Sequence, residues 1–254
     1  MTVLVLDAGN TRLRAALAAD PRQWPGLLPA GAAPRPALDR VGELPTAAAA
    51  ADAGPWLREL ADRHRPDAAV LVSVVPALDP LFAAALPGLR GAGLGCPLPF
   101  ALDVEDPAAV GADRLCNVTA AAAAGWRRAL VVDAGTATTF DLLLDGVFVG
   151  GLIAPGMAFA ARCLGEAAAR LAPVPFGPAP LDAGRSTAAA LAAGGWHAGQ
   201  GGVRHIVAGL RARYGDLPVV VTGGLGGDLA DLGHLDPDWT LRGALALAAP
   251  LAQR

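Results

Sequence analysis

The amino-acid sequence predicts an α/β fold with mixed β-sheets, and two observations support this prediction. Runs of apolar and β-branched residues alternate with segments of helical pattern along the 254 residues, which is typical of α/β proteins. The second observation is an internal repeat, because residues 3–17 read VLVLDAGNTRLRAAL and residues 130–143 read LVVDAGTATTFDLL. Each copy is an apolar strand that breaks into a turn at Asp-Ala-Gly, so one unit of structure is expected twice.

The composition supports a well-packed protein and excludes several classes of function. Hydrophobic residues make up 54% of the chain and charged residues 17%, which suffices for one large domain or two of roughly 100 to 150 residues. The net charge of -3 gives no sign of a nucleic-acid-binding surface or a basic membrane-binding patch. The sequence contains no lysine, which excludes a P-loop and any Schiff-base mechanism.

Cysteine usage and hydropathy predict a cytoplasmic protein. Cys96, Cys116 and Cys163 form no C-x-x-C pair, so we expect reduced and mostly buried thiols. The start of the chain lacks the basic and apolar regions of a signal peptide, and no uncharged stretch is both long and apolar enough to span a bilayer. We therefore expect neither a membrane nor a nucleic acid as a partner.

In the first half of the chain, the pattern predicts two strands and one helix. The strands are expected over residues 2–7 and 69–75. Residues 20–54 are rich in proline, alanine and glycine and give no assignment beyond short strands and loops. A helix is expected over residues 56–65, because Pro55 would then stand at a favoured place in its first turn.

The second half is expected to begin with a helix over residues 112–126 that ends near Gly125 and joins the two halves. A strand at residues 129–133 follows, and Asp145-Gly146 between two apolar runs predicts a β-hairpin over residues 138–153. Further along, the pattern predicts a helix from 157 to about 171, a proline-rich break at 173–180, helices to 213, a strand at 218–222 and a final helical segment.

The first copy of the repeat ends in Asp7-Ala8-Gly9-Asn10-Thr11. A glycine just after a strand lets the backbone approach a phosphate, and the Asn10 and Thr11 side chains can donate hydrogen bonds to its oxygens. Asp7 carries the same sign of charge as a phosphate, so its natural role there is to hold hydrated Mg²⁺. A single motif of this kind is more often an ordinary polar turn.

The second copy ends in Asp133-Ala134-Gly135-Thr136-Ala137-Thr138-Thr139. Three hydroxyl groups around a glycine turn can form a second cradle for a phosphate or a cation, and Asp133 could ligate a monovalent cation through oxygen. Alone this string is also weak. Two such strings, each preceded by an expected strand, are much less expected by chance than one.

A third motif, Gly111-Ala112-Asp113-Arg114, stands at the expected start of a helix. Asp113 is either a general base that accepts a proton from a substrate hydroxyl, with Arg114 binding an anionic group, or a charge that only stabilises the helix. The glycine-rich strings 150–156 and 222–224 are either ordinary turns or flat backbone surfaces for a nucleotide. The four histidines are dispersed, and we assign none to a metal.

Taken in order, these motifs resemble those of type III pantothenate kinase. The resemblance covers nearly the whole chain and rests on D-x-G-N-T at residues 7–11, S-V-V-P at 73–76, G-A-D-R at 111–114, D-A-G-T-A-T-T at 133–139, G-G-L-I-A-P-G at 150–156 and T-G-G at 222–224.

The resemblance implies two tandem ribonuclease H-like halves with mixed sheets, as in actin-like ATPases and the acetate and sugar kinases, with ATP in the cleft between them. The halves would be residues 1–115 and 116–254, and the second would carry the interface of a homodimer. The implied reaction is the ATP-dependent phosphorylation of pantothenate to 4′-phosphopantothenate, the first step of coenzyme A biosynthesis. The implied cofactors are Mg²⁺ with ATP, and K⁺ or NH₄⁺.

The resemblance also implies roles for individual residues. Asp113 would accept the proton, Asp133 would ligate the monovalent cation, and Asp7 would hold Mg²⁺ through water. The remaining implied contacts are with ATP, from Asp7, Ala8, Gly9, Asn10, Thr11, Arg12, Leu13, Arg14 and Thr136, and with pantothenate, from Gly111, Ala112, Asp113, Arg114 and Thr187.

One position departs from the family pattern. Members often carry a tyrosine at the pantothenate pocket, seven residues before the glycine of G-A-D-R, and this chain has Val104 there. Phe100 is a candidate to replace that aromatic surface. Two other functions stay open: a non-catalytic regulator, which the intact Asp7, Asp113 and Asp133 argue against, and a kinase of the same fold that acts on a sugar or a short carboxylic acid.

Overall fold

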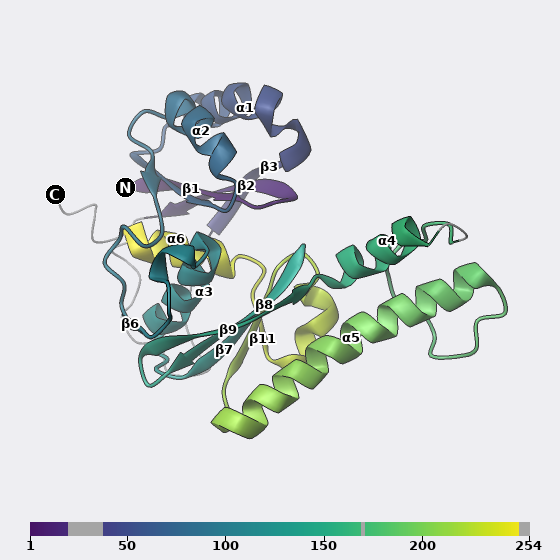
Figure 1. The fold of residues 1–254 in the computed structure, drawn as a ribbon. Helices are drawn as coiled ribbons and strands as arrows, with labels where there is room; N and C mark the ends of the chain where they lie inside the picture. Colours follow the sequence, from purple (N-terminus) through teal and green to yellow (C-terminus); the bar gives the residue numbers. More distant parts are fainter. Residues whose placement is uncertain (20–37, 169–170, 249–254) are drawn as a thin grey trace. The chain divides into compact units, whose positions relative to one another are not determined.

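The structure, a computed structural model, describes residues 1–19, 38–168 and 171–248 (Figure 1). It divides into two compact units, and each is described by itself. The first unit contains residues 1–128, 142–150 and 238–254, and the second contains residues 129–141 and 151–237, apart from the residues that are not described. The boundary predicted after residue 115 stays a prediction.

The first sheet contains five strands in the order β3-β2-β1-β4-β5. Its central strand, β1, is antiparallel to β2 and parallel to β4. Residues alternate between the two faces along β1, as the strand geometry requires: Val3 and Val5 belong to one buried cluster, and Leu4 and Leu6 to the other. The strands are β1 (Thr2–Ala8), β2 (Arg12–Ala19), β3 (Leu38–Pro45), β4 (Ala68–Ser73) and β5 (Arg90–Gly91).

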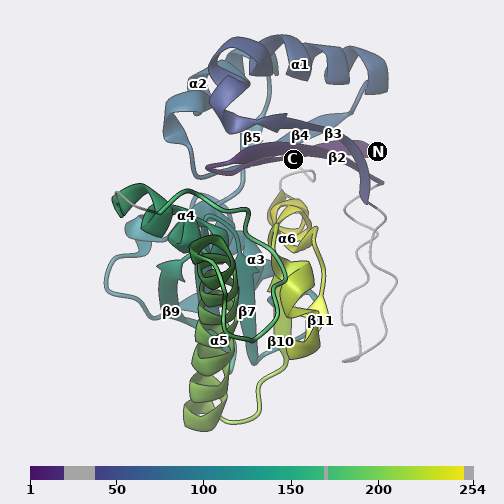
Figure 2. The same ribbon diagram turned by 90° about the vertical axis from the view of Figure 1, so that its right-hand side faces the viewer.

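Two pairs of helices cover this sheet, one pair on each face. The cluster of Leu4 and Leu6 contains side chains of α1 (Ala49–His64) and α2 (Asp79–Ala85). The opposite cluster contains side chains of α3 (Ala112–Ala123) and α6 (Trp239–Ala248), so the last helix of the chain packs on the sheet formed by its first strands (Figure 2). The core is therefore a sheet between two helical layers.

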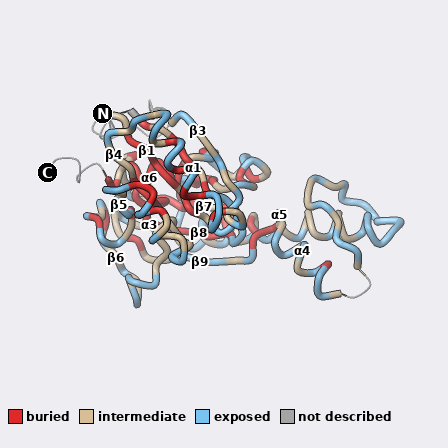
Figure 3. The backbone as a smooth tube through the Cα atoms, turned by 90° about the horizontal axis from the view of Figure 1, so that it is seen from above, coloured by how far each residue is buried: buried red, intermediate tan, exposed pale blue. Residues whose placement is uncertain are grey.

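The second sheet has the strand order β11-β10-β7-β8-β9-β6. Without β6, this order repeats that of the first sheet, and β10 is parallel to β7 just as β4 is parallel to β1. The predicted internal repeat is thus confirmed at the level of topology, and Figure 3 shows both β1 and β7 as buried strands. The strands are β6 (Ala101–Leu102), β7 (Ala129–Ala134), β8 (Ala137–Leu144), β9 (Val147–Pro155), β10 (Val219–Thr222) and β11 (His234–Leu235).

The predicted hairpin at Asp145-Gly146 is confirmed. Both residues have positive φ, 54° and 86°, which is the backbone geometry of the tight turns that favour such pairs. In the second unit, α4 (Met157–Ala167) packs beside the long α5 (Thr187–Tyr214), as Figure 1 shows. Short 3₁₀ helices complete the described part of the chain: η2 (Thr46–Ala48), η3 (Pro76–Leu78), η4 (Pro107–Ala109) and η5 (Gly226–Leu232).

The structure corrects three expectations. Helix α1 begins at Ala49 instead of residue 56, so Pro55 lies inside it; the alanines before Pro55 are strong helix formers that carry the helix past it. Strand β2 was not predicted, because its sequence RLRAALAA is rich in alanine and weak in strand-forming residues. The segment expected to be helices up to residue 213 contains one helix, α5.

Residues 20–37 of the unassigned segment lie outside the described residues. No described helix is long and apolar enough to cross a membrane.

Candidate functional site

The first Asp-Ala-Gly motif forms the turn between β1 and β2. Its backbone closes through a hydrogen bond from Gly9 N to Arg12 O of 3.0 Å. Thr46, from η2, holds the turn from outside, since its hydroxyl donates to Gly9 O at 2.7 Å and its backbone N–H donates to Thr11 O at 2.9 Å. The side chains of Asn10, Thr11 and Arg12 are exposed. The turn is therefore a fixed backbone that presents polar side chains to solvent.

Ser73, at the end of the neighbouring β4, supports the same edge of the sheet. Val74 N donates to Ala8 O at 3.0 Å, and the Ser73 hydroxyl donates to Asp79 Oδ1 at 2.6 Å. The S-V-V-P motif is thus a structural continuation of the first turn. Sequence reasoning found this motif, but it missed Thr46, which lies in the segment that gave no assignment.

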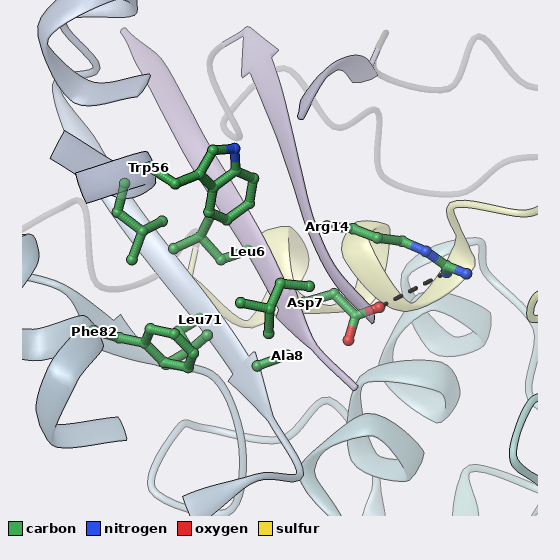
Figure 4. A pocket seen from close by; sticks show the side chains of 9 residues that line it. Leu6, Asp7, Ala8, Arg14, Trp56, Leu71 and Phe82 are labelled. Carbon is green, nitrogen blue, oxygen red and sulfur yellow. Dashed lines mark ion pairs between the residues drawn. The ribbon is translucent and has the colours of Figure 1, made fainter. Parts of the chain in front are cut away.

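Asp7 and Arg14 stand directly opposite each other on β1 and β2. Their nearest oxygen and nitrogen, Oδ2 and Nη1, lie 3.9 Å apart, and both side chains are partly exposed. Because Asp7 follows Val3 and Val5 at alternate positions, its carboxylate lies on the face that carries α3 and α6. Figure 4 shows the carboxylate turned towards the Arg14 guanidinium. This pair is an anion and a cation at the end of a buried strand.

Ala8 and Leu13, which the phosphate-loop assignment also includes, point to the other face and belong to the core with α1 and α2. Only their backbone atoms could contact a phosphate. A small pocket on this side, lined mostly by apolar residues such as Trp56 and Phe82 (Figure 4), has a cavity volume of about 10 Å³. That is far less than the roughly 300 to 1,000 Å³ of typical small-molecule sites, so this pocket is packing space below the turn.

Asp113 lies in the first turn of α3, where one carboxylate oxygen, Oδ1, accepts a hydrogen bond from Arg114 N at 2.8 Å. A Cβ at Gly111 would lie 2.5 Å from Asp113 Oδ1, so a larger residue there would displace this carboxylate. Burial raises the pKa of Asp113 above its ordinary value, and the hydrogen bond and charge of Arg114 oppose part of that rise. A carboxylate that binds a proton more readily than usual is suited to proton transfer.

Asp7 and Asp113 lie on the same side of the first sheet. Burial raises the pKa of the Cys116 thiol, and the negative charges of Asp113 and then Asp7 raise it further. Cys116 belongs to the cluster between the first sheet and α3 and α6. The fold therefore brings the end of β1 and the start of α3 together within the first unit, although about 100 residues separate them in the sequence.

The second Asp-Ala-Gly motif forms the turn between β7 and β8, closed by a hydrogen bond from Gly135 N to Ala137 O at 3.0 Å. Two glycines from other segments approach it closely. A Cβ at Gly223 would lie 2.5 Å from Asp133 Oδ1, and a Cβ at Gly156 would lie 2.2 Å from Gly135 O. The two glycine-rich strings are thus close backbone contacts of this turn, and the site gathers carboxylate and carbonyl oxygens.

The remaining predicted residues lie as follows. Thr136 is exposed in the second turn, and Thr187 is exposed as the first residue of α5. The Arg114 guanidinium lies 5.6 Å from the centre of the Phe148 ring, a cation–π distance. Gly111 and Ala112 are half-buried at the start of α3. Within the described residues, no group of three or more His, Cys, Asp or Glu could hold a metal.

Phe100 is not the aromatic surface that sequence reasoning considered. Its ring is buried and packs edge-on against Phe148, with centroids 6.2 Å apart at 67°. Val104 lies near Gly150, since a Cβ there would be 3.7 Å from Val104 Cγ1. The aromatic contact of this region therefore serves the core and Arg114.

Comparison with known proteins gives one consistent family. A sequence model described as type III pantothenate kinase matches residues 3–209. A type III pantothenate kinase of Acidiphilium cryptum (strain JF-5) is 34% identical over 270 aligned residues, which cover 96% of this chain and 93% of that protein. Another type III pantothenate kinase, of Hyphomonas neptunium (strain ATCC 15444), is 31% identical over 268 aligned residues, which cover 96% of this chain and 97% of that protein.

Solved structures share the fold at low sequence identity. A protein described as a Baf family transcriptional activator from Campylobacter jejuni has a TM-score of 0.59 at 18% identity, with 99% of this chain and 100% of that chain covered. An activator of 2-hydroxyisocaproyl-CoA dehydratase from Clostridium difficile, with bound ADPNP, has a TM-score of 0.54 at 12% identity, with 98% and 94% covered. Together with the repeated strand order, these likenesses confirm the predicted fold class of two tandem ribonuclease H-like halves.

Proposed function

The chain belongs to the type III pantothenate kinase family, and from this premise we propose how its residues transfer a phosphoryl group from ATP to pantothenate. The reaction of the family is the first step of coenzyme A biosynthesis, and this chain is an enzyme of that activity. Phosphoryl transfer has three requirements: a positioned acceptor hydroxyl, a group that takes the proton of this hydroxyl, and positive charge near the phosphates. We assign the positioning of this hydroxyl, the uptake of its proton and the positive charge to described side chains.

Asp113 is the proton acceptor in this proposal. Its carboxylate takes the proton of the pantothenate primary hydroxyl, whose oxygen attacks the γ-phosphorus of ATP while the bond to ADP breaks. Two observations support this role: the carboxylate has a defined place, beside Gly111 and Arg114 N, and burial raises its pKa. A raised pKa makes a carboxylate a stronger base in its ionised form.

The first turn binds the phosphates of ATP. Asn10, Thr11 and Arg12 offer exposed donors on a backbone that Thr46 holds in place, and Arg14 adds positive charge from the neighbouring strand. Asp7 fits Mg²⁺, because its partly exposed carboxylate is a hard oxygen ligand that can meet a hydrated ion. Mg²⁺ supplies charge neutralisation to the phosphates when it is bound.

The second turn binds a monovalent cation and one edge of ATP. Asp133 Oδ1 and the Gly135 carbonyl lie beside Gly223 and Gly156, which approach them closely because they have no Cβ, and such oxygen donors suit K⁺ or NH₄⁺. The cation would offset charge near the phosphates. Thr136, exposed in the same turn, contacts ATP.

Pantothenate is bound by Gly111, Ala112 and Arg114 beside Asp113, with Thr187 as a further contact. Arg114 suits the substrate carboxylate, because a guanidinium binds carboxylates through paired hydrogen bonds. Its cation–π contact with Phe148 limits its freedom. Val104 takes the place at which the family often has tyrosine, so we expect this chain to bind pantothenate through polar contacts more than through aromatic ones.

We also assign the chain to a homodimer in the cytoplasm. Four exposed apolar side chains lie on β9 and α4 of the second unit: Leu152 is 41%, Ile153 64%, Phe159 39% and Leu164 49% exposed. A second copy of the chain is the occupant that a homodimeric family predicts for them. The three free cysteines accord with a reducing compartment.

The observation that carries the proposal is the position of Asp113, whose carboxylate accepts a hydrogen bond from Arg114 N in the first turn of α3, within a chain of this family. The test is to incubate the purified protein with Mg-ATP and pantothenate, with and without K⁺, and to measure ADP and 4′-phosphopantothenate. We expect K⁺-dependent product from pantothenate and none from a panel of sugars and short carboxylic acids. Phosphorylation of a sugar without any of pantothenate would reject the acceptor proposed here.

A further inference from the structure

Asn117 is fully buried on α3, one helical turn after Asp113. Its side-chain oxygen, Oδ1, accepts a hydrogen bond from the Thr240 hydroxyl at 2.9 Å. Its backbone carbonyl accepts a second bond, from Trp239 Nε1, also at 2.9 Å. Both donors come from α6, so the last helix of the chain is bonded to the helix that carries Asp113.

The two helices also meet at backbone level. A Cβ at Gly243 of α6 would lie 1.8 Å from the Cys116 carbonyl oxygen, so α6 rests against α3 at the residue before Asn117. At the other end of the contact, Trp126 and Trp239 stack with centroids 5.9 Å apart. Helix α6 therefore packs directly against the middle of α3, at Cys116 and Asn117, and against Trp126, which follows α3 in the chain.

The first turn of α3 has less support of its own. Gly111, its N-cap residue, supplies no side-chain hydrogen bond to the described helix. Asp113 uses one carboxylate oxygen on Arg114 N, within the same turn. The place of the Asp113 carboxylate thus depends on how the next turn, with Cys116 and Asn117, is held.

We infer that Asn117 and Thr240 are positioning residues for Asp113, because the hydrogen bond between them fixes the rotation and depth of α3 against α6. This inference rests on the proposed function of Asp113. The charged group that acts on Asp113 electrostatically is Arg114, on the same helix, and the negative charges of Asp113 and Asp7 both act on Cys116 in the adjoining core. The Asp113 carboxylate is largely buried. If the first turn of α3 moved away from the core, water would reach this carboxylate.

The test replaces Thr240 by valine, which keeps the shape of the side chain and removes the hydroxyl. Asn117 then keeps a buried acceptor without this donor, a state that proteins avoid. We expect kcat to fall about 10- to 100-fold, because small misplacements of a reacting group cost that much, while the KM for ATP stays within about twofold of the normal value. We also expect the acid limb of the kcat profile to move to lower pH, as Asp113 gains water and loses part of its raised pKa.

Two variants make the result specific. Thr240→Ser keeps the hydroxyl and should restore both kcat and the pH profile. Thr119→Val is the matched control, because Thr119 is also a buried threonine, and its hydroxyl donates to Leu115 O of its own helix, α3, at 2.7 Å. If Thr240→Val fails to fold, Trp239→Phe removes the second bond to Asn117 and should move the same readouts in the same direction.

The inference is overturned if Thr240→Val, or Trp239→Phe in its place, leaves kcat and the acid limb unchanged, or if Thr240→Ser is as impaired as Thr240→Val. Asp113→Asn, assayed in parallel, separates this from failure of the proposed function. If Asp113→Asn keeps full activity, kcat no longer reports on the position of Asp113. The positioning role is then tested by titrating the Asp113 carboxyl with ¹³C NMR. An Asp113 pKa that falls towards its ordinary value in Thr240→Val supports positioning, and an unchanged pKa rejects it.

Discussion

Replacing Gly223 by alanine should damage the second turn more than its size suggests. The added Cβ would lie 2.5 Å from Asp133 Oδ1 and 2.7 Å from backbone atoms of Ala134. Real contacts of a Cβ essentially never fall below 3.0 Å, so the carboxylate oxygen must move by at least the difference, 0.5 Å. The backbone of Ala134, in the buried β7, has little room to give. The strain therefore falls on the atoms proposed to hold the monovalent cation.

The cost has two separable parts. Gly223 has a φ of 87°, a conformation that costs an L-residue roughly 1 to 2 kcal/mol. The overlap with packed atoms adds roughly 1 to 3 kcal/mol, so Gly223→Ala should destabilise the protein by about 2 to 5 kcal/mol. Gly88→Ala isolates the first part, since Gly88 has a φ of 86° and no atom within 4 Å of an added Cβ. Gly227→Ala should cost almost nothing, because that site has neither a positive φ nor a neighbour within 4 Å.

Urea unfolding of the three variants measures these differences, and turnover against K⁺ concentration measures the effect on the site. We expect the order of destabilisation to be Gly223, then Gly88, then Gly227. We also expect Gly223→Ala to need more K⁺ for half-maximal turnover. A Gly223→Ala variant that is no less stable than Gly88→Ala would refute the close approach on which the reasoning depends.

Three further predictions concern other parts of the molecule. Asp113→Asn should raise the free energy of unfolding at neutral pH. Burial raises the pKa of Asp113 in the folded state, so the stability contributed by this group is lost as pH rises from its unfolded pKa through its folded pKa. Asparagine carries no charge at any of these pH values and avoids this loss. The gain should shrink towards acid pH in parallel urea titrations, and a gain independent of pH would contradict it. Thr46→Val should raise the KM for ATP about 2- to 10-fold, the equivalent of one hydrogen bond; an unchanged KM in steady-state kinetics would remove Thr46 from the support of the first turn. Ile153→Glu should shift the protein from dimer to monomer in analytical ultracentrifugation, whereas Leu94→Glu, at another exposed apolar residue, should leave the dimer intact; a dimeric Ile153→Glu variant would place the interface elsewhere.

Features set by neighbouring residues could be predicted from the sequence. The hairpin at Asp145-Gly146 was predicted because its turn geometry depends on those two residues. Both Asp-Ala-Gly turns were predicted because an apolar strand ends before each of them. Strand β2 was missed, since its alanine-rich sequence satisfies neither strand nor helix strongly.

Features set by packing between distant segments could not be predicted. Nothing near Asp113 in the sequence shows that α6, more than 100 residues later, holds the helix that carries it. The one signal was the scarcity of asparagine, because Asn10 and Asn117 are the only two in the sequence and both lie in or beside motifs. The sequence around Thr46 contains no motif that indicates a contact with the first turn, because Thr46 is a single threonine before an alanine-rich segment.

The central claim is that Asp113 accepts the proton of the substrate hydroxyl, and kcat of Asp113→Asn tests it most directly. The substitution keeps the shape of the side chain and removes its basicity. We predict that kcat falls roughly 10²- to 10⁴-fold, the usual loss for a positioned general base, while the dissociation constant for ATP stays within about twofold of the normal value. An undiminished kcat with pantothenate would contradict the account.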